Sequence, residues 1–373
     1  MGLEIDTLLF RAAEMKASDL HICEGEAVVV RVGGSLGKLA DMPPDELLKN
    51  SLGRDVGGES GEAGRSACYT VTGQQSIFPV TENNVYELFE PVLPEKQKII
   101  LKDRGECDFA YALASGCRFR INLYRSTEGL NAAVRIIPKE VPTCGGLGLP
   151  ESIRKLAELK SGLVLITGVT GSGKSTTLAA LIDEINRNRA VHVLTLEDPV
   201  EFKFVSNRSL INQREIGRDT DSFVSGLRAA LREDPDVICV GELRDLETIA
   251  IAVTAAETGH LVLATLHTRG AAETVNRIID VFPEQQQQQI RIQLAGSLQA
   301  VVSQQLLPDR QGGRMAAFEI MIVTPALRNL IREGKTQQME SYIQTGSHYG
   351  MQTMEAAVDK LKMEGKIFVK NVN

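Results

Sequence analysis

Eight residues, GVTGSGKS at positions 168–175, have the types and spacing of a loop that binds phosphate. They match the pattern G-x-x-x-x-G-K-S/T and lie between an apolar run at 163–167 and a helical pattern. Glycines let such a loop turn its N–H groups toward phosphate oxygens, and the N-terminus of the following helix favours an anion. The lysine would reach the β- and γ-phosphates, and Ser175 would place its hydroxyl on Mg²⁺. The expected nucleotide-binding residues are Gly168, Thr170, Gly171, Ser172, Gly173, Lys174, Ser175 and Thr176.

Two further apolar runs end in acids. The run 236–242 ends in Glu242, where a Walker B carboxylate would meet the metal directly or through water. The run before 197–201 ends in Glu197, Asp198 and Glu201, and either glutamate could accept a hydrogen bond from a water near the γ-phosphate. In an open parallel sheet the ligand lies beyond the carboxyl ends of the strands, so these acids should face the phosphate loop. The alternative is that they are ordinary acids at strand ends.

Two histidines, His260 and His267, bracket a further apolar run. No additional metal ligands accompany them, and a histidine at a strand end is more often a hydrogen-bonding group than a ligand. We therefore expect them to sense the γ-phosphate or to position the strand.

The elements that must carry these residues alternate along the chain. From residue 162 onward, apolar β-rich runs alternate with helical patterns, which favours a mostly parallel sheet covered on both faces. Beyond residue 271 the pattern is mostly helical, with one strand expected at 316–324. The spacing at 326–332 is that of an amphipathic helix packed on a core.

The first part of the chain predicts a separate α+β domain over residues 1–138. A helical pattern at 3–16 precedes β-rich runs at 19–23, 27–32, 107–112, 118–124 and 132–137. Residues 50–66 have no periodicity, and an insertion or loop is expected over about 50–89. The proline- and glycine-rich segment predicts a linker at 139–152, followed by a second domain at 153–373.

Composition limits the partners of the chain. Lys and Arg number 41 against 48 Asp and Glu, and the net charge of −7 does not favour nucleic acid or anionic lipid. The six cysteines form no C-x-x-C pair, so neither a zinc site nor a redox motif is indicated. The start of the chain lacks the features of a signal peptide, and no apolar run approaches the roughly 20 residues of a membrane span. We expect a cytoplasmic protein that reaches a membrane only through a partner.

The phosphate loop, LEDPVEF, DPDVICVGELRD and GHLVLATLHT, in this order and spacing, resemble the secretion ATPases of type II secretion and type IV pili. The resemblance covers nearly all of residues 85–345. It implies a PAS-like N-terminal domain, a RecA-like ATPase domain with a helical C-terminal part, ATP and Mg²⁺, and a homohexameric ring. It also implies that Glu201 is the catalytic glutamate, and that the active site is completed by Glu242, Arg244, His260 and His267.

Within this family the chain looks most like the motors that retract type IV pili. The segment ASDLH at 17–21 resembles their entry to the first domain, and TPALRNLIREGK at 324–335 resembles their C-terminal motif. The zinc insertion of assembly ATPases, which has four cysteines, is missing from the sequence. The resemblance implies an inner-membrane platform protein as partner, and a peripheral place at that membrane. It also implies that Arg120 and Arg135 of the first domain reach the nucleotide, although both could be solvated strand arginines.

Three other functions remain open. The chain could be a pilus-assembly or type II secretion ATPase, or a nucleotide-binding ring regulator that hydrolyses little. A nucleic-acid translocase of the conjugation type is less favoured, because the net charge is −7 and no basic stripe with interleaved aromatic residues is present in the sequence.

Overall fold

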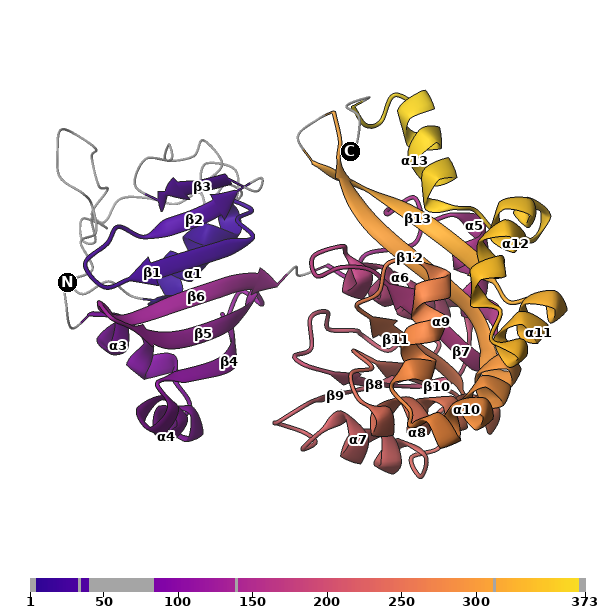
Figure 1. Cartoon of the computed structure of the whole chain (residues 1–373). Coiled ribbons are helices and arrows are strands. Elements are labelled where there is room, and N and C mark those ends of the chain that lie inside the picture. The colour runs from indigo at the N-terminus through magenta and orange to yellow at the C-terminus, as the bar shows by residue number, and fades with distance from the viewer. Residues whose placement is uncertain (1–4, 33–34, 40–83, 138–139, 311–312, 369–373) are drawn as a thin grey trace. The chain divides into compact units, whose positions relative to one another are not determined.

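The computed structural model describes residues 5–32, 35–39, 84–137, 140–310 and 313–368. The chain divides into two compact units, Met1–Ile137 and Pro138–Asn373, which are described separately below (Figure 1). The loop expected at 50–66, and the remainder of the expected insertion up to residue 83, lie outside the described residues.

The first unit is a six-stranded antiparallel sheet in the order β3-β2-β1-β6-β5-β4. Its strands are β1 (Asp19–Cys23), β2 (Val29–Val32), β3 (Ser35–Lys38), β4 (Glu106–Ala112), β5 (Arg118–Ser126) and β6 (Gly129–Ile137). Its helical elements are α1 (Ile5–Glu14), α3 (Asn84–Phe89), η2 (Glu90–Val92) and α4 (Glu95–Arg104). In β5 the buried Phe119, Ile121 and Leu123 alternate with more exposed residues, so one face of the sheet builds the core and the other carries polar side chains.

The end of the expected insertion is part of this core. Residues 84–89 form helix α3, and both Val85 and Phe89 are completely buried. These residues of the expected insertion or loop are therefore helical, and a helix of six residues is too short to show a clear periodicity in the sequence.

The second unit is a seven-stranded sheet in the order β13-β12-β7-β11-β10-β8-β9. Its strands are β7 (Gly162–Thr167), β8 (His192–Glu197), β9 (Leu210–Glu215), β10 (Val237–Val240), β11 (Leu261–Leu266), β12 (Leu298–Pro308) and β13 (Arg314–Ile322). All neighbouring strands are parallel except β12 and β13. The prediction of a mostly parallel sheet is confirmed.

Helices cover both faces of this sheet, as Figure 1 shows. They are α5 (Glu151–Arg154), η3 (Lys155–Glu158), α6 (Lys174–Asn188), α7 (Phe223–Ala230), α8 (Leu246–Glu257), α9 (Ala271–Asp280), α10 (Glu284–Ser297), α11 (Pro325–Glu333), η4 (Thr336–Gln338), α12 (Met339–Thr345), η5 (Ser347–Tyr349) and α13 (Met354–Met363). In β7, Leu163 and Leu165 join the core under α8 to α11, whereas Val164 and Ile166 join the core under α6. Burial on both faces explains why the central strands are continuous apolar runs.

Strand β12 was not predicted. Its eleven residues include the polar Gln299, Ser303, Gln304 and Gln305, which interrupt the apolar pattern, and the region was expected to be helical. It nevertheless pairs with β7 on one side and β13 on the other, so it lies beside the strand that enters the phosphate loop.

The C-terminal helices match the expected pattern. Thr324 is the N-cap of helix α11, and its hydroxyl accepts a hydrogen bond from the Leu327 N–H. The helix buries Leu327, Leu330 and Ile331. The prediction of an amphipathic helix at 326–332 is confirmed. Among the described residues, no helix has the length and apolar character that crossing a membrane requires.

The segment expected as a linker belongs to the second unit. Cys144 and Leu149 are buried, with exposures of 1% and 7%, in the core that α6 covers. The Cys144 thiol also lies 3.2 Å from the Ala180 carbonyl oxygen of α6. Residues 140–152 are therefore packed structure rather than a free connection, because their apolar side chains find a core between the prolines and glycines.

This packing predicts that Leu149→Ala destabilises the second unit by about 2–4 kcal/mol, because it leaves a cavity in a close-packed core. The matched control is Val205→Ala, whose side chain is 83% exposed and should change stability by less than about 0.5 kcal/mol. Hydrogen exchange of the β7 and α6 amides measures the difference. Equal protection in the two variants would show that residues 140–152 do not support this core.

Candidate active site

The phosphate loop joins β7 to α6 at the carboxyl edge of the second sheet. Gly168, Gly171 and Gly173 have φ values of +146°, +78° and +86°, a region that side chains disfavour. Gly173 is the N-cap of α6 and Lys174 its first residue, with no side chain capping the helix and no acid in its first turn. The backbone N–H groups at this helix N-terminus are therefore directed toward the space where an anion would bind.

Lys174 is the central charge of the loop. Its side chain is buried, and Nζ donates hydrogen bonds to the carbonyl oxygens of Gly168 at 2.8 Å and Val169 at 3.2 Å. Burial lowers the pKa of Lys174, while the charges of Glu242 and Glu201 act in the opposite direction. A desolvated ammonium held by two carbonyls is stabilised when a phosphate oxygen approaches it.

Other atoms of the loop also fit a phosphate. The Ser172 hydroxyl is buried and makes no hydrogen bond within the described part of the chain. A Cβ added at Gly171 would meet no atom within 4 Å, so the loop is open at that point. Ser175 is exposed in the first turn of α6, where its hydroxyl is accessible to a metal ion.

Glu242 follows β10 and is linked to the loop through His267. Its carboxylate lies 2.7 Å from Arg244 Nε and 3.3 Å from His267 Nε2. The other ring nitrogen of His267 lies 3.3 Å from the Thr170 hydroxyl and 3.5 Å from Lys174 Nζ. A hydroxyl at Ser175 and a carboxylate at Glu242 are the hard oxygen donors that suit Mg²⁺, which keeps several waters and phosphate oxygens as further ligands.

Glu197, the last residue of β8, and Glu201, which follows the strand, differ in their surroundings. Glu197 accepts hydrogen bonds from the Thr195 hydroxyl at 2.7 Å and from Gln213 Nε2 at 3.0 Å. Burial raises the pKa of Glu197, and these hydrogen bonds oppose the rise. The carboxylate of Glu197 is thus occupied by side chains of β8 and β9, which leaves Glu201 as the better candidate for contact with water.

Strand β9 holds the segment that carries Glu201. Gln213 donates to the Phe202 carbonyl at 2.8 Å and accepts from the Phe204 N–H at 2.9 Å. Glu215 accepts from the Val200 N–H at 3.1 Å. Sequence reasoning missed Gln213 and Glu215, because polar residues on an edge strand have no pattern that distinguishes them from solvent-exposed side chains.

His260 is not part of this arrangement. It precedes β11, and its carbonyl accepts a hydrogen bond from Gly162 N at the start of β7, whereas the phosphate loop follows the end of β7. The six residues of β11 separate the two edges of the sheet by about 20 Å. Within one chain, His260 therefore lies at the opposite edge of the sheet from the phosphate loop, because histidines at opposite ends of one strand face opposite edges.

Arg120 and Arg135 belong to the first unit. They are directly paired residues on β5 and β6, and their side chains are 39% and 66% exposed. Arg120 lies 3.7 Å from Asp108, and Arg135 lies 3.2 Å from Asp19. The structure thus brings the two arginines together on the polar face of their own sheet.

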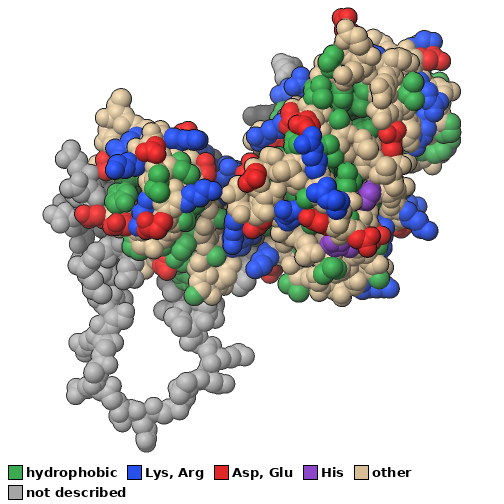
Figure 2. All heavy atoms as spheres, turned by 90° about the horizontal axis from the view of Figure 1, so that it is seen from below, with side chains coloured by type: hydrophobic (Ala, Val, Ile, Leu, Met, Phe, Trp, Pro, Cys, Tyr) green, Lys and Arg blue, Asp and Glu red, His purple; other side chains and the backbone are tan. Residues whose placement is uncertain are grey.

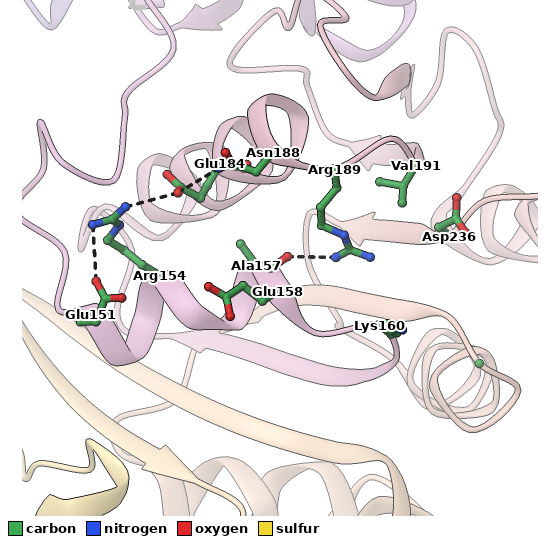
Figure 3. Close-up of a pocket in the computed structure, with 11 residues that line it drawn as sticks. Glu151, Arg154, Ala157, Glu158, Lys160, Glu184, Asn188, Arg189, Val191 and Asp236 are labelled. Atoms are coloured by element: carbon green, nitrogen blue, oxygen red, sulfur yellow. Dashed lines mark hydrogen bonds and ion pairs between the residues drawn. The ribbon is translucent and has the colours of Figure 1, made fainter.

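A pocket of about 860 Å³ lies at the amino edge of the second sheet, near Asp236 and Gly259 (Figure 3). Arg154 on one side of it is ion-paired with Glu151 and Glu184, and Arg189 donates to the carbonyls of Ala157 and Leu159. No phosphate-loop residue lines it, so it is not the nucleotide site.

A phosphate loop after β7 of a mostly parallel sheet, with an acid after β10, the next strand but one, defines a P-loop ATPase. A family described as "Type II/IV secretion system protein" matches residues 114–373, and the chain belongs to this family.

The chain is similar along most of its length to proteins of this family. It is 43% identical over 369 residues to the "Type IV pilus retractation ATPase PilT" of Pseudomonas aeruginosa, covering 99% of this chain and 97% of the relative. It is 50% identical over 301 residues to the "Uncharacterized protein YggR" of Escherichia coli, covering 81% and 92%. A crystal structure of the pilus retraction motor PilT with bound ADP matches with a TM-score of 0.82 at 42% identity, covering 99% of this chain and 95% of that one.

The loop geometry predicts that Gly168→Ala and Gly171→Ala have different effects on the nucleotide-free protein. Both residues have positive φ, so either alanine costs about 1–2 kcal/mol of backbone strain. Only at position 168 does the new Cβ also collide, 2.4 Å from the Gln304 carbonyl oxygen. Gly168→Ala should therefore lower the melting temperature more than Gly171→Ala does. Equal melting temperatures would contradict the tight approach of β12 to the loop.

Proposed function

We propose that this protein is a homohexameric motor that hydrolyses ATP to power the retraction of type IV pili. The observation that carries the proposal is the combination of the Lys174 loop and the Glu242–His267 pair in a chain similar to PilT over 99% of its length. The motor would act at the cytoplasmic side of the inner membrane, where it would contact a platform protein of the pilus machinery.

The proposed reaction is in-line attack of water on the γ-phosphate. Glu201 would orient the water, and Lys174 and the N–H groups of the loop would stabilise the charge that develops on the phosphate oxygens. Mg²⁺, held by Ser175 and Glu242 directly or through water, would neutralise further charge. Arg244 and His267 would keep the Glu242 carboxylate in place through the contacts described above.

Arg120 and Arg135 would supply charge from the first unit. Their direct cross-strand pairing places the two arginines side by side on the same face of the sheet. A triphosphate would compete with Asp108 and Asp19, whose ion pairs with these arginines are partly exposed and therefore weak. An arginine that stabilises phosphoryl charge accelerates transfer by about 10³-fold or more.

The surface of α11 would transmit the motion or contact a partner. Arg328 is occupied within the unit, because it donates to the carbonyls of Ala295 and Gly296 at the end of α10. Asn329, Arg332 and Glu333 are exposed on the same helix. Arg332 donates to Asn329 at 2.8 Å and Lys335 lies 2.8 Å from Glu333, and a partner would compete with these exposed contacts. Figure 2 shows basic and acidic side chains interspersed on one face of the described residues, a pattern more suited to a protein partner than to nucleic acid.

Deletion of the gene in the source organism, examined by electron microscopy, tests this function. Retraction predicts cells with excess pili that no longer retract, and the wild-type gene should restore retraction. Glu201→Gln should fail to restore it, because loss of a general base costs about 10²-fold or more in rate. The control Glu257→Gln, which changes an exposed carboxylate paired with Gln293, should restore it.

Two outcomes of this experiment would contradict the proposal. Bare cells would indicate a pilus-assembly ATPase instead. Full complementation by Glu201→Gln would indicate a nucleotide-binding ring regulator that does not depend on hydrolysis.

A further inference from the structure

Gln304 is a buried polar residue that lies against the phosphate loop. Its side chain is 2% exposed, and it follows Ser303, which pairs with the last residue of β7, Thr167. Gln304 therefore stands level with Gly168, where the loop begins. Burying an amide without partners is costly, so its hydrogen bonds indicate what it does.

The side chain of Gln304 joins the end of the loop to the helix that follows. Its Nε2 donates to the Ser172 carbonyl at 2.6 Å, and its Oε1 accepts from the Thr177 hydroxyl at 2.7 Å. A carbonyl can only accept, so the amide nitrogen must face Ser172. Of the charged and polar side chains of this length, only an amide offers the donor and the acceptor that these two partners require together.

The same residue also limits the shape of the loop. An added Cβ at Gly168 would lie 2.4 Å from the Gln304 main-chain oxygen, and one at Gly173 would lie 2.9 Å from its Nε2. Gln304 thus touches the first residue of the loop, its end and the first turns of α6. Its burial means that it acts on a nucleotide through the loop and not by direct contact.

Ser303, the preceding residue, holds a second loop on the other side of β12. Its hydroxyl accepts from the Gly270 N–H at 2.9 Å, and Glu319 of β13 accepts from the neighbouring Ala271 N–H at 2.7 Å. This second loop follows His267, which contacts Glu242. Consecutive residues of β12 therefore fix the loops that carry Lys174 and His267.

We infer that Gln304 is a positioning residue for nucleotide binding, which holds the phosphate loop in its binding shape before the ligand arrives. Preorganisation of this kind saves the ordering cost that binding would otherwise incur. The inference concerns the nucleotide site and does not depend on what the ATPase drives.

Isothermal titration of the purified full-length protein with ADP tests this role. Gln304→Leu introduces a side chain of similar size that can form neither hydrogen bond. It should weaken ADP binding by about 10- to 100-fold. The matched control is Gln305→Leu, the same change at the next residue, which is exposed and should leave the affinity within about threefold. Gln304→Glu keeps the acceptor for Thr177 but places a carboxylate against the Ser172 carbonyl, so it should weaken binding as well.

A merely structural role predicts a different result. It would lower the melting temperature of Gln304→Leu while leaving the ADP affinity of the folded protein unchanged, and that outcome would overturn the inference. If Gln304→Leu does not fold, the ADP affinities of Thr177→Val and Thr177→Ser are compared instead, because only Thr177→Ser keeps the hydroxyl that donates to Gln304. Weaker ADP binding in Thr177→Val, with binding retained in Thr177→Ser, supports the role of Gln304, whereas equal affinities in the two variants overturn it.

Discussion

A dehydrated positive charge at Lys174 is the constraint on which the rest of the second unit depends. The ammonium is buried at the start of α6 and is held by two carbonyls of its own loop. Removing a charge from water is expensive unless other groups compensate. The two carbonyl oxygens of the loop compensate for part of the lost hydration, and a phosphate group would compensate for more of it. The unfavourable desolvation of the Lys174 ammonium therefore favours the binding of an anion at this site.

The large parallel sheet makes such an arrangement rigid. Strand β7 is buried on both faces, so its end cannot move without disturbing two cores. Side chains of β12 and β9, which lie on opposite sides of β7 in the sheet order, then hold the neighbouring loops by hydrogen bonds. Gln304 of β12 holds the phosphate loop, while Gln213 of β9 holds the segment that presents Glu201. Glutamine suits both places because its amide can donate to one carbonyl and accept from another group.

The sequence predicted the parts of the site whose chemistry depends on a short local pattern. The loop at 168–175, the acid after β10 and the continuous apolar strands were all visible in this way. Strand β12 was missed because four polar residues interrupt its apolar pattern. The partners of such residues lie far away in the chain, as in the hydrogen bonds of Gln304 with Ser172 and Thr177. The position of His260 at the opposite edge of the sheet could not be predicted, because a histidine's residue type does not reveal which edge it occupies. Gln213 could not be identified, because its role depends on a loop that folds back onto β9.

The most direct test of this account is the rate of phosphate release from Mg·ATP by the purified full-length protein, compared with that of Lys174→Ala over a range of protein concentrations. If the buried ammonium is the centre of an ATPase site, the wild type should show turnover that saturates with ATP, and Lys174→Ala should show none above background. Equal rates for the two proteins, or no turnover by the wild type at any concentration, would contradict the account.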